Sequence, residues 1–352
     1  MKIITILGAR PQFIKAAAFS RAVKKYSNIE EVIIHTGQHY DQNMSDVFFE
    51  EMNIPKPKYK LQTGGKNHGA MTGQQLEKIE EILLQEKPHL VLVYGDTNST
   101  LAGALAAIKL HIPIAHVEAG LRSFNRQMPE EINRILTDQI SEYLFVPSEG
   151  AKQNLLNEGI DEQKIFIVGD IMYDVSLYYK EKMIKPIWFD YLDLDRFILC
   201  TIHRAENTDD MNKLINILKG LELSGKNIIL PLHPRTVNKI KQYGLDIPTN
   251  IRVVEPIGYL EMVWLEVHCD LIVTDSGGVQ KEAYFHGKPC ITLREETEWV
   301  ELVDAGFNQL VGSNAMLIVD SIQKIDKTVI ENTSIYGEGD TAYGILDILK
   351  SG

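Results

Sequence analysis

The feature that most constrains the fold is an alternation of short apolar runs with amphipathic helical patterns along almost the whole chain. Such an alternation predicts a parallel sheet that is covered by helices on both faces. Two series of predicted strands follow one another. We expect the first series at 3–7, 31–35, 90–94, 112–116, 143–146 and 165–168, and the second at 197–201, 227–230, 252–254, 271–274, 289–293 and 309–311.

The two series predict an α/β chain with two Rossmann-like domains that face a common cleft. A length of 352 residues suits two domains and is too long for one ordinary domain. The stretch 170–195 is rich in Tyr, Lys and Asp and is expected to be an irregular linker. We therefore predict an N-terminal domain at 1–169, completed by a C-terminal helix at 338–352, and a C-terminal domain at 170–337.

The composition argues against several classes of protein. A net charge of −12 without a basic stripe disfavours a nucleic-acid binder, although local cations could still hold an anionic ligand. Cys200, Cys269 and Cys290 stand in separate apolar stretches, which is typical of buried reduced thiols, and no metal-site spacing is visible. We see neither a signal-peptide pattern nor an apolar run of membrane-spanning length. We expect a cytoplasmic protein without a metal.

Polar residues follow three predicted strands of the first series, at the edge where open α/β sheets bind ligands. Arg10 follows the first strand and Lys15 lies about one helical turn further on, so both could contact a phosphate group. Asp96 stands between a strand and a helix and, taken alone, fits a helix N-cap better than a catalytic acid. Glu118 ends an apolar strand, where burial would raise the pKa of its carboxyl.

Glu130 and Arg134 lie about one helical turn apart at the start of the next predicted helix, after Pro129. The positive end of the helix dipole would by itself account for the acid. A surface ion pair would equally account for Glu130 and Arg134 together.

The second series repeats this arrangement of polar residues after strands. His203 follows the first strand together with Arg204 and Glu206, and structural and catalytic roles for it are about equally supported. His233 and Arg235 follow the next strand. Further on, a turn with two glycines lets backbone N–H groups approach a phosphate, and an acid one turn into the helix could bind ribose hydroxyls. These predicted nucleotide-binding residues are Ser276, Gly277, Gly278 and Glu282. The glycine pattern is not that of an NAD site.

Together, these loops resemble those of the non-hydrolysing UDP-N-acetylglucosamine 2-epimerases, and the resemblance runs nearly end to end. The motifs that carry it are Gly8-Ala-Arg-Pro-Gln-Phe-Ile-Lys15, Thr36-Gly-Gln-His39, Gly95-Asp-Thr97, His116-Val-Glu-Ala-Gly-Leu-Arg122, Pro129-Glu-Glu-Ile-Asn-Arg134, Thr274-Asp-Ser-Gly-Gly-Val-Gln280 and Gly287-Lys-Pro289.

The resemblance implies the two-domain fold of GT-B glycosyltransferases and inversion of C2 of a UDP-N-acetylhexosamine, UDP-GlcNAc to UDP-ManNAc, for cell-surface polysaccharide precursors. In that family, loss of the C2 proton and of UDP leaves a 2-acetamidoglucal, to which UDP adds back. The implied catalytic residues are Asp96, Glu118, Glu130 and His203, with Asp96 and Glu118 as the proton-transfer pair. The implied binding residues are Arg10, Lys15, Arg134, His233, Arg235, Ser276, Gly277, Gly278 and Glu282. No cofactor is implied, and the family suggests a homodimer.

Several positions depart from the usual family pattern. Gln12 stands where Glu is typical, the loop after Arg122 is short, Trp299 replaces a usual Arg, and Gln74 replaces an Arg of the regulatory site, which argues against activation by the substrate. These traits resemble both the branch acting on UDP-2,3-diacetamido-2,3-dideoxyglucuronate and archaeal-type enzymes that use UDP-GlcNAc. Both substrates stay open, with UDP-GlcNAc first. A GT-B glycosyltransferase is the alternative from another reaction class.

Overall fold

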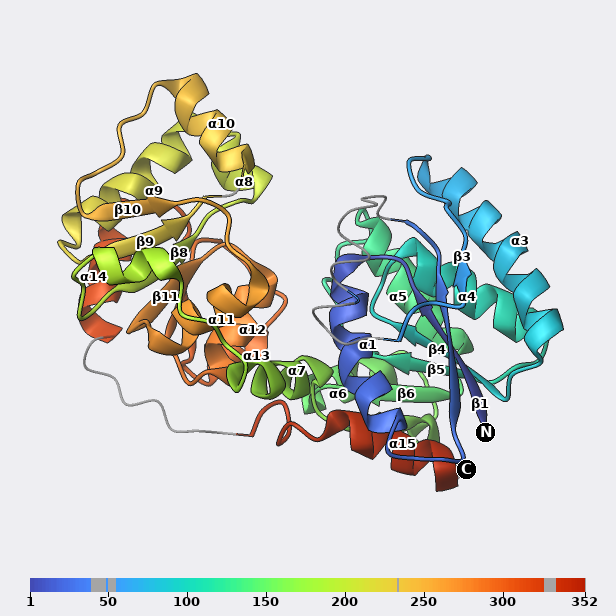
Figure 1. Ribbon diagram of the computed structural model, residues 1–352. Coiled ribbons are helices and arrows are strands. Elements are labelled where there is room, and N and C mark those ends of the chain that lie inside the picture. The colour runs from blue at the N-terminus through green and yellow to red at the C-terminus, as the bar shows by residue number, and fades with distance from the viewer. Residues whose placement is uncertain (39–48, 50–54, 233, 326–333, 352) are drawn as a thin grey trace. The chain divides into compact units, whose positions relative to one another are not determined.

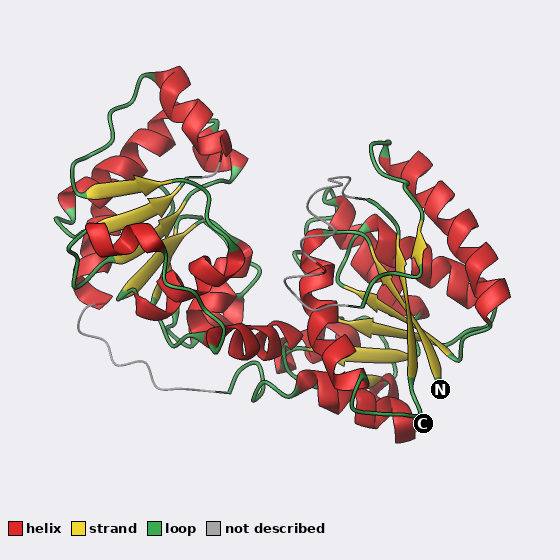
Figure 2. Ribbon diagram, viewed as in Figure 1, coloured by secondary structure: helices red, strands yellow, loops and turns green. Residues whose placement is uncertain are grey.

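The computed structural model of the chain describes residues 1–38, 49, 55–232, 234–325 and 334–351 (Figure 1). The chain forms two compact units, one made of Met1–Val175 and Ser334–Gly352 and the other of Ser176–Thr333. Each unit contains one parallel sheet with helices, so the predicted α/β class with two parallel sheets is confirmed (Figure 2). Which ligand each unit binds stays a prediction.

The sheet of the first unit has the strand order β3-β2-β1-β4-β5-β6-β7, and neighbouring strands are parallel. The strands are β1 (Lys2–Leu7), β2 (Glu30–His35), β3 (Tyr59–Lys60), β4 (Leu90–Tyr94), β5 (Ile114–Val117), β6 (Tyr143–Val146) and β7 (Ile165–Ile167). The strand order reverses between β1 and β4. A crevice for a ligand opens at such a reversal, beyond the carboxyl ends of the strands.

Helices cover the sheet of the first unit. They are α1 (Arg10–Val23), α3 (His68–Glu86), α4 (Asn98–Lys109), α5 (Pro129–Ile140), α6 (Glu149–Asn157) and α15 (Thr341–Ser351), and α7 (Ile171–Lys180) runs from this unit into the next. Ile4 and Ile6 of β1 pack in one cluster with Val91 and Val93 of β4 and with Ile79 of α3. Strands β1 and β4 are apolar along most of their length because strands of a parallel sheet are covered on both faces.

The sheet of the second unit has the order β10-β9-β8-β11-β12-β13, again with parallel neighbours. The strands are β8 (Ile198–Thr201), β9 (Ile228–Pro231), β10 (Ile251–Val254), β11 (Leu271–Thr274), β12 (Cys290–Thr292) and β13 (Asn308–Leu310). The helices are α8 (Ala205–Thr208), α9 (Met211–Leu223), α10 (Pro234–Tyr243), α11 (Tyr259–His268), α12 (Gly277–Phe285), α13 (Val300–Asp304) and α14 (Ala315–Ile325). Here the order reverses between β8 and β11.

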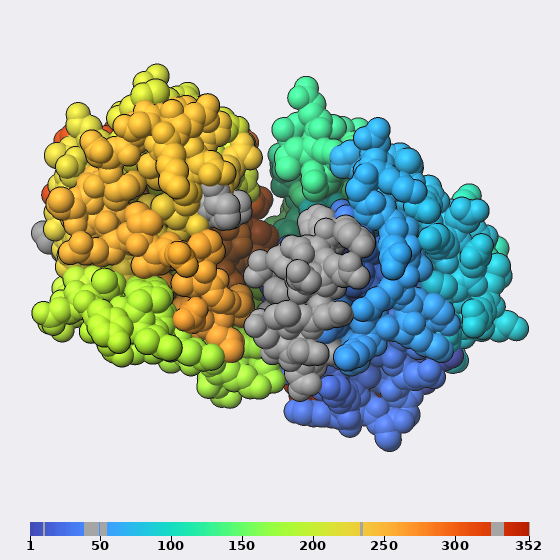
Figure 3. Space-filling view, turned by 45° about the horizontal axis from the view of Figure 1, so that its top comes forward, coloured from blue at the N-terminus to red at the C-terminus, as the bar shows by residue number. Residues whose placement is uncertain are grey.

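Alternate side chains of β8 enter two different clusters, one on each face of the second sheet. Ile198 and Cys200 pack with Leu214 of α9, whereas Leu199 packs with Phe189. The two-residue period of a strand explains this division. The segment after α7, coloured yellow-green in Figure 3, therefore covers one side of the second unit, where its apolar residues close the core.

The stretch 170–195 is not the irregular linker that we expected from its sequence. It forms α7 and a 3-10 helix at Ile187–Tyr191. On α7, the Asp174 carboxylate accepts hydrogen bonds from the backbone N–H groups of Thr341 (3.0 Å) and Ala342 (2.8 Å). It thereby satisfies the first donors of α15, which packs against α1 (Figure 1). Composition could not show that contact, because its partners are far apart in sequence.

The described residues also bear on the cysteines, on membrane spans and on metal sites. Cys200, Cys269 and Cys290 are buried thiols, as predicted. Within the described ranges, no helix is both long and apolar enough to cross a membrane. In the same ranges, no three His, Cys, Asp or Glu side chains form a group that could hold a metal ion.

Candidate active site

The first candidate half-site lies at the carboxyl ends of β1, β4 and β5, where the strand order of the first unit reverses. Lys15 of α1 and Glu118, just after β5, form an ion pair whose side chains are about nine-tenths buried. A Cβ atom placed on Gly95, just after β4, would lie 3.4 Å from Glu118 Oε2 and 3.7 Å from Lys15 Nζ. The structure therefore brings together residues from three strand ends that the sequence analysis singled out.

Glu118 has a backbone conformation that is unusual for its residue type. Its φ angle is +71°, in the left-handed region that glycine favours. The N–H groups of Glu118 and Ala119 both donate to the carbonyl of Phe145 on β6, at 3.1 Å. Backbone strain of this kind persists where the surroundings enforce it and clusters at functional sites.

Asp96 is not the N-cap of α4, which was the simpler interpretation of its position. The cap is Thr97, whose side chain accepts from the Thr100 N–H at 3.3 Å. The Asp96 carboxylate instead forms an ion pair with Arg134 of α5. Burial raises the pKa of Asp96, the Arg134 guanidinium lowers it, and the nearby Glu118 carboxylate raises it again, for a net rise. A carboxyl with a raised pKa can exchange protons more readily near neutral pH.

Glu131, and not Glu130, is the acid that contacts Arg134. The Glu131 carboxylate is buried and lies 3.0 Å from Arg134 Nη1, while Glu130 is exposed at the start of α5. Arg134 therefore does not form the expected surface pair with Glu130. It forms two ion pairs instead, one with Asp96 and one with Glu131, and we call these three residues the Asp96 series. Glu131 was not predicted to be a site residue, although its position in the Pro129-Glu-Glu motif was the available signal. Arg10 is the first residue of α1, and its side chain lies outside the described part.

His116 of β5 supports the backbone beside these acids. It is fully buried; Nε2 lies 2.7 Å from the carbonyl oxygen of Gly95, and Nδ1 lies 2.7 Å from Asp138 Oδ1. Asn133 of α5 donates to the carbonyl oxygen of Asp96 at 2.9 Å. These contacts fix the main chain that carries Asp96, so His116 and Asn133 are further residues that sequence reasoning missed.

The second candidate half-site lies at the carboxyl ends of β8 and β11, at the reversal of the second sheet. Asp275, directly after β11, is fully buried and organises this edge. Its carboxylate accepts from the backbone N–H groups of His203 (3.1 Å) and Arg204 (3.0 Å) and from Asn207 Nδ2 (3.1 Å). His203 Nδ1 lies 3.4 Å from the same carboxylate. Asp275 was quoted within a motif but was not predicted to have a role.

The turn after Asp275 leads into α12 through a capping serine and two glycines. Ser276 is the N-cap of α12, and its hydroxyl accepts from the Val279 N–H at 3.4 Å. Gly277 and Gly278 follow as the first residues of the helix. A Cβ atom on Gly277 would lie only 2.2 Å from Glu298 Oε1, and Trp299 Nε1 donates to the Gly277 carbonyl at 2.9 Å. The loop containing Trp299 therefore packs closely on this turn.

Glu282 lies further along α12, in a cluster of buried titratable groups. Its carboxyl is 3.5 Å from the Tyr259 hydroxyl and interacts with Glu266 of α11. Burial raises the pKa of both acids. Burial lowers the pKa of the nearby His286 to about 4, and its Nε2 lies 3.5 Å from Glu266 Oε2. Glu282 therefore belongs to a cluster of buried carboxyls, and its role toward a ribose stays a prediction.

The remaining predicted residues of the second unit have less direct support. Arg235 of α10 is paired with Asp209 at 2.5 Å and donates from Nε to Thr208 Oγ1 at 3.1 Å, and nearly half of its side chain is exposed. His233 lies outside the described residues. A nucleotide role for either residue stays a prediction.

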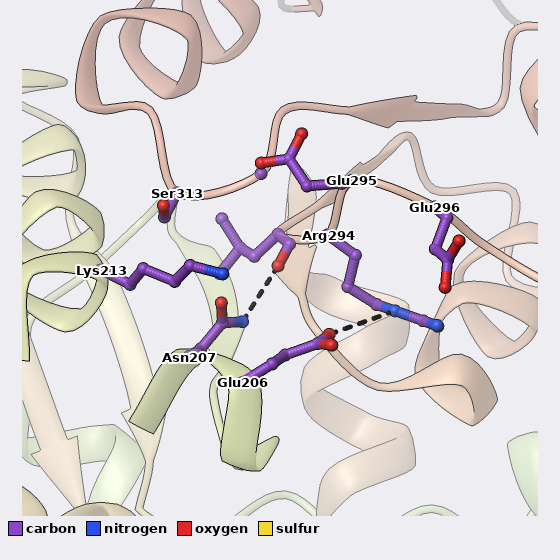
Figure 4. Close-up of a pocket in the computed structure, with 9 residues that line it drawn as sticks. Glu206, Asn207, Lys213, Arg294, Glu295, Glu296 and Ser313 are labelled. Carbon is purple, nitrogen blue, oxygen red and sulfur yellow. Dashed lines mark hydrogen bonds and ion pairs between the residues drawn. The ribbon is translucent and has the colours of Figure 1, made fainter. Parts of the chain in front are cut away.

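A small cavity of about 130 Å³ lies near the ends of β12 and β13 (Figure 4). Its charged lining residues are Glu206, Lys213, Arg294, Glu295 and Glu296. Figure 4 shows the Glu206 carboxylate facing Arg294, whose Nε lies 3.5 Å away. Acids outnumber bases in this lining, so the cavity is poorly suited to a diphosphate, and it contains no residue of the predicted site.

Comparison with known proteins gives one consistent family. The family model described as UDP-N-acetylglucosamine 2-epimerase matches residues 21–350. The UDP-2,3-diacetamido-2,3-dideoxy-D-glucuronate 2-epimerase of Pseudomonas aeruginosa is 53% identical, and the match covers 99% of each chain. A UDP-N-acetylglucosamine 2-epimerase homolog of Methanococcus maripaludis is also 53% identical over all of both chains. The crystal structure of Methanocaldococcus jannaschii UDP-GlcNAc 2-epimerase in complex with UDP-GlcNAc and UDP has a TM-score of 0.87 at 47% identity and full coverage of both chains.

Proposed function

Because this chain belongs to the UDP-N-acetylglucosamine 2-epimerase family, we propose that it inverts C2 of a UDP-linked N-acetylhexosamine. The proposed reaction has two stages. A base takes the proton from C2 while the C1–O bond to UDP breaks, which leaves a 2-acetamidoglucal with a C1–C2 double bond. UDP then bonds to C1 again while an acid delivers a proton to the opposite face of C2.

One observation carries this proposal above all: Asp96 and Glu118 stand at the ends of the neighbouring strands β4 and β5, each in an ion pair of its own. A C2 proton is weakly acidic, so its removal requires a positioned base, and inversion requires an acid on the other face. We propose Asp96 and Glu118 as this pair. Glu130 is proposed to assist from the exposed start of α5.

The departing diphosphate needs fixed positive groups, since negative charge grows on it as the C1–O bond breaks. In the first unit, Lys15 and Arg134 supply cations beside the acids, and Arg10 is proposed to join them. In the second unit, the N-terminus of α12 at Ser276, with Gly277 and Gly278, offers backbone N–H groups. His203 is proposed to contact the diphosphate, and Glu282 the ribose.

The substrate is proposed to be UDP-GlcNAc, with UDP-2,3-diacetamido-2,3-dideoxyglucuronate as the alternative. Identity does not separate the two, because the relatives with these two kinds of name are both 53% identical to the chain. Proton NMR of the purified protein with each nucleotide in turn decides between them. Turnover of one substrate and none of the other gives the answer.

The reaction class is tested by running the conversion in D2O. An epimerase of this type places deuterium at C2 of its product, whereas a product without C2 label would refute the proposed elimination. A glycosyltransferase would leave the UDP-sugar unchanged and would release UDP only when an acceptor is added. We also propose, from the family alone, a cytoplasmic homodimer that supplies a cell-surface polysaccharide precursor; size-exclusion chromatography with light scattering tests the dimer.

A further inference from the structure

Glu131 lies at the centre of a hydrogen-bonded network that the proposed reaction does not use directly. Its carboxylate is 1% exposed and has three donors around it. Oε2 accepts from the Ser123 N–H at 3.0 Å and lies 3.0 Å from Arg134 Nη1, and Oε1 accepts from the Phe124 N–H at 2.9 Å. One buried carboxylate therefore joins the loop 123–128 to the arginine that pairs with Asp96.

The loop at 123–128 requires this support because its backbone is unusual. Phe124 has a φ angle of +58°, which a residue with a Cβ rarely adopts, and 79% of the residue is exposed. An exposed ring offers little burial to compensate for that conformation. The two N–H groups held by Glu131 are what fix it, since a strained backbone persists where its surroundings enforce it.

Arg134 shows why the same carboxylate matters for the acid. Its guanidinium is planar, with Nη1 toward Glu131 and Nη2 toward Asp96. Holding one side of a planar fork fixes the other side. The charged groups that face Asp96 are Arg134 from α5, Glu118 after β5 and Lys15 from α1. Arg134 is thus the cation that pairs with Asp96, and the buried Glu131 carboxylate controls its direction.

We propose that Glu131 is a positioning residue, which orients Arg134 on Asp96 and holds the loop 123–128 in place with the same carboxylate. The inference rests on the proposed function for its catalytic consequence but not for its structural one. Glu131 itself does not touch the substrate in this scheme. Its effect on turnover passes entirely through Arg134 and the loop.

The test replaces Glu131 by Gln, which keeps the length of the side chain but removes its charge and one acceptor. We expect kcat to fall by ~10²-fold, the loss typical of a misplaced catalytic group, with KM changed by less than about threefold. The matched control is Glu142→Gln, which removes a carboxylate that pairs with Lys164 at 2.9 Å just before β6, at the opposite end of the sheet from Asp96. That control should keep the kcat of the parent.

Two readouts do not depend on turnover. Carbon NMR follows the titration of the Asp96 carboxyl, whose signal is assigned by comparison with Asp96→Asn. This carboxyl should titrate at a higher pH in Glu131→Gln than in the parent, because burial then acts on it without a fixed cation beside it. Trypsin should cut after the exposed Arg126 faster than in the parent. If the chain turns over no UDP-sugar but both readouts change, the proposed function fails and the positioning role stands.

An unchanged Asp96 titration and an unchanged rate of cleavage at Arg126 would overturn the proposal, whatever the kinetics. If Glu131→Gln fails to fold, Glu131→Asp tests the proposal in its place. This variant keeps the charge, but its side chain is one methylene too short to reach both the loop and Arg134. Parent-like kcat, titration and proteolysis in Glu131→Asp would likewise overturn it. Intermediate changes in all three would support it.

Discussion

At the scale of single residues, Asp96 makes the clearest prediction. Asn has nearly the shape of Asp but cannot exchange a proton, so Asp96→Asn should lower kcat by about 10²–10⁴-fold, the usual contribution of a general acid or base. The variant should keep its circular dichroism spectrum, because Thr97 and not Asp96 caps α4. Glu142→Gln, at an exposed pair with Lys164, is the control and should be fully active. Parent-like turnover by Asp96→Asn would remove Asp96 from the mechanism.

The buried acids of the second unit predict a pH dependence of stability. Burial raises the pKa of Glu266 and Glu282 above the unfolded value, so the folded state holds more protons than the unfolded state as pH rises above 4.5. Their contribution to stability is therefore present at low pH and is lost as pH rises. His286, with a pKa lowered to about 4, acts in the opposite direction between pH 4 and 6.5. The effect of the acids is seen cleanly only above pH 6.5.

Replacing Glu266 by Gln removes one of these acids without changing its volume much. Glu266 is fully buried beside Glu282, so ionisation of the two acids places like charges in the core and lowers the stability of the parent. At pH 8.5, we expect Glu266→Gln to melt at a higher temperature than the parent, with a free energy of unfolding greater by on the order of 1 kcal/mol. At pH 5, the two proteins should melt at about the same temperature. Differential scanning calorimetry at both pH values checks this. A difference that is equal at both would contradict it.

At the scale of elements, strands and strand ends were the predictable part. The strand at 90–94 lies where its apolar run predicted it, because a central parallel strand is apolar along its whole length. The strand expected at 112–116 lies at Ile114–Val117, and β3 (Tyr59–Lys60) is too short to leave a pattern. The strand ends located Asp96, Glu118 and Lys15. Contacts such as Asp275 to the His203 loop were not predictable, since they depend on which loops meet in space.

Gly120 yields a prediction about the loop that carries Glu118. Its φ is +77°, and a Cβ there would lie 2.4 Å from the carbonyl oxygen of Ala151 on α6. Gly120→Ala should destabilise the protein by about 1–3 kcal/mol or more, from strain and from the backbone clash. Gly150→Ala, in the first turn of the same helix and with 3.8 Å to its nearest atom, should be neutral or stabilising by a few tenths to ~1 kcal/mol. Urea unfolding of both variants compares them; equal midpoints would show that the loop adapts freely.

At the scale of the whole molecule, hydrogen exchange with UDP tests which of the two units binds the nucleotide. We expect slower exchange at the start of α12 and in the loop after β8, because backbone N–H groups at Ser276–Gly278 and around His203 would be covered. Saturating UDP, at 100 times its Kd, should also add about 2.7 kcal/mol to the stability of the unit that binds it. Lys213, Gly312 and Ser313, which line the cavity near β12 and β13, should exchange as before and provide an internal control. Protection confined to residues 1–175 would place UDP on the first unit and contradict the proposed assignment of UDP to the second unit. The epimerase proposal rests on Asp96 and Glu118 and would be unaffected.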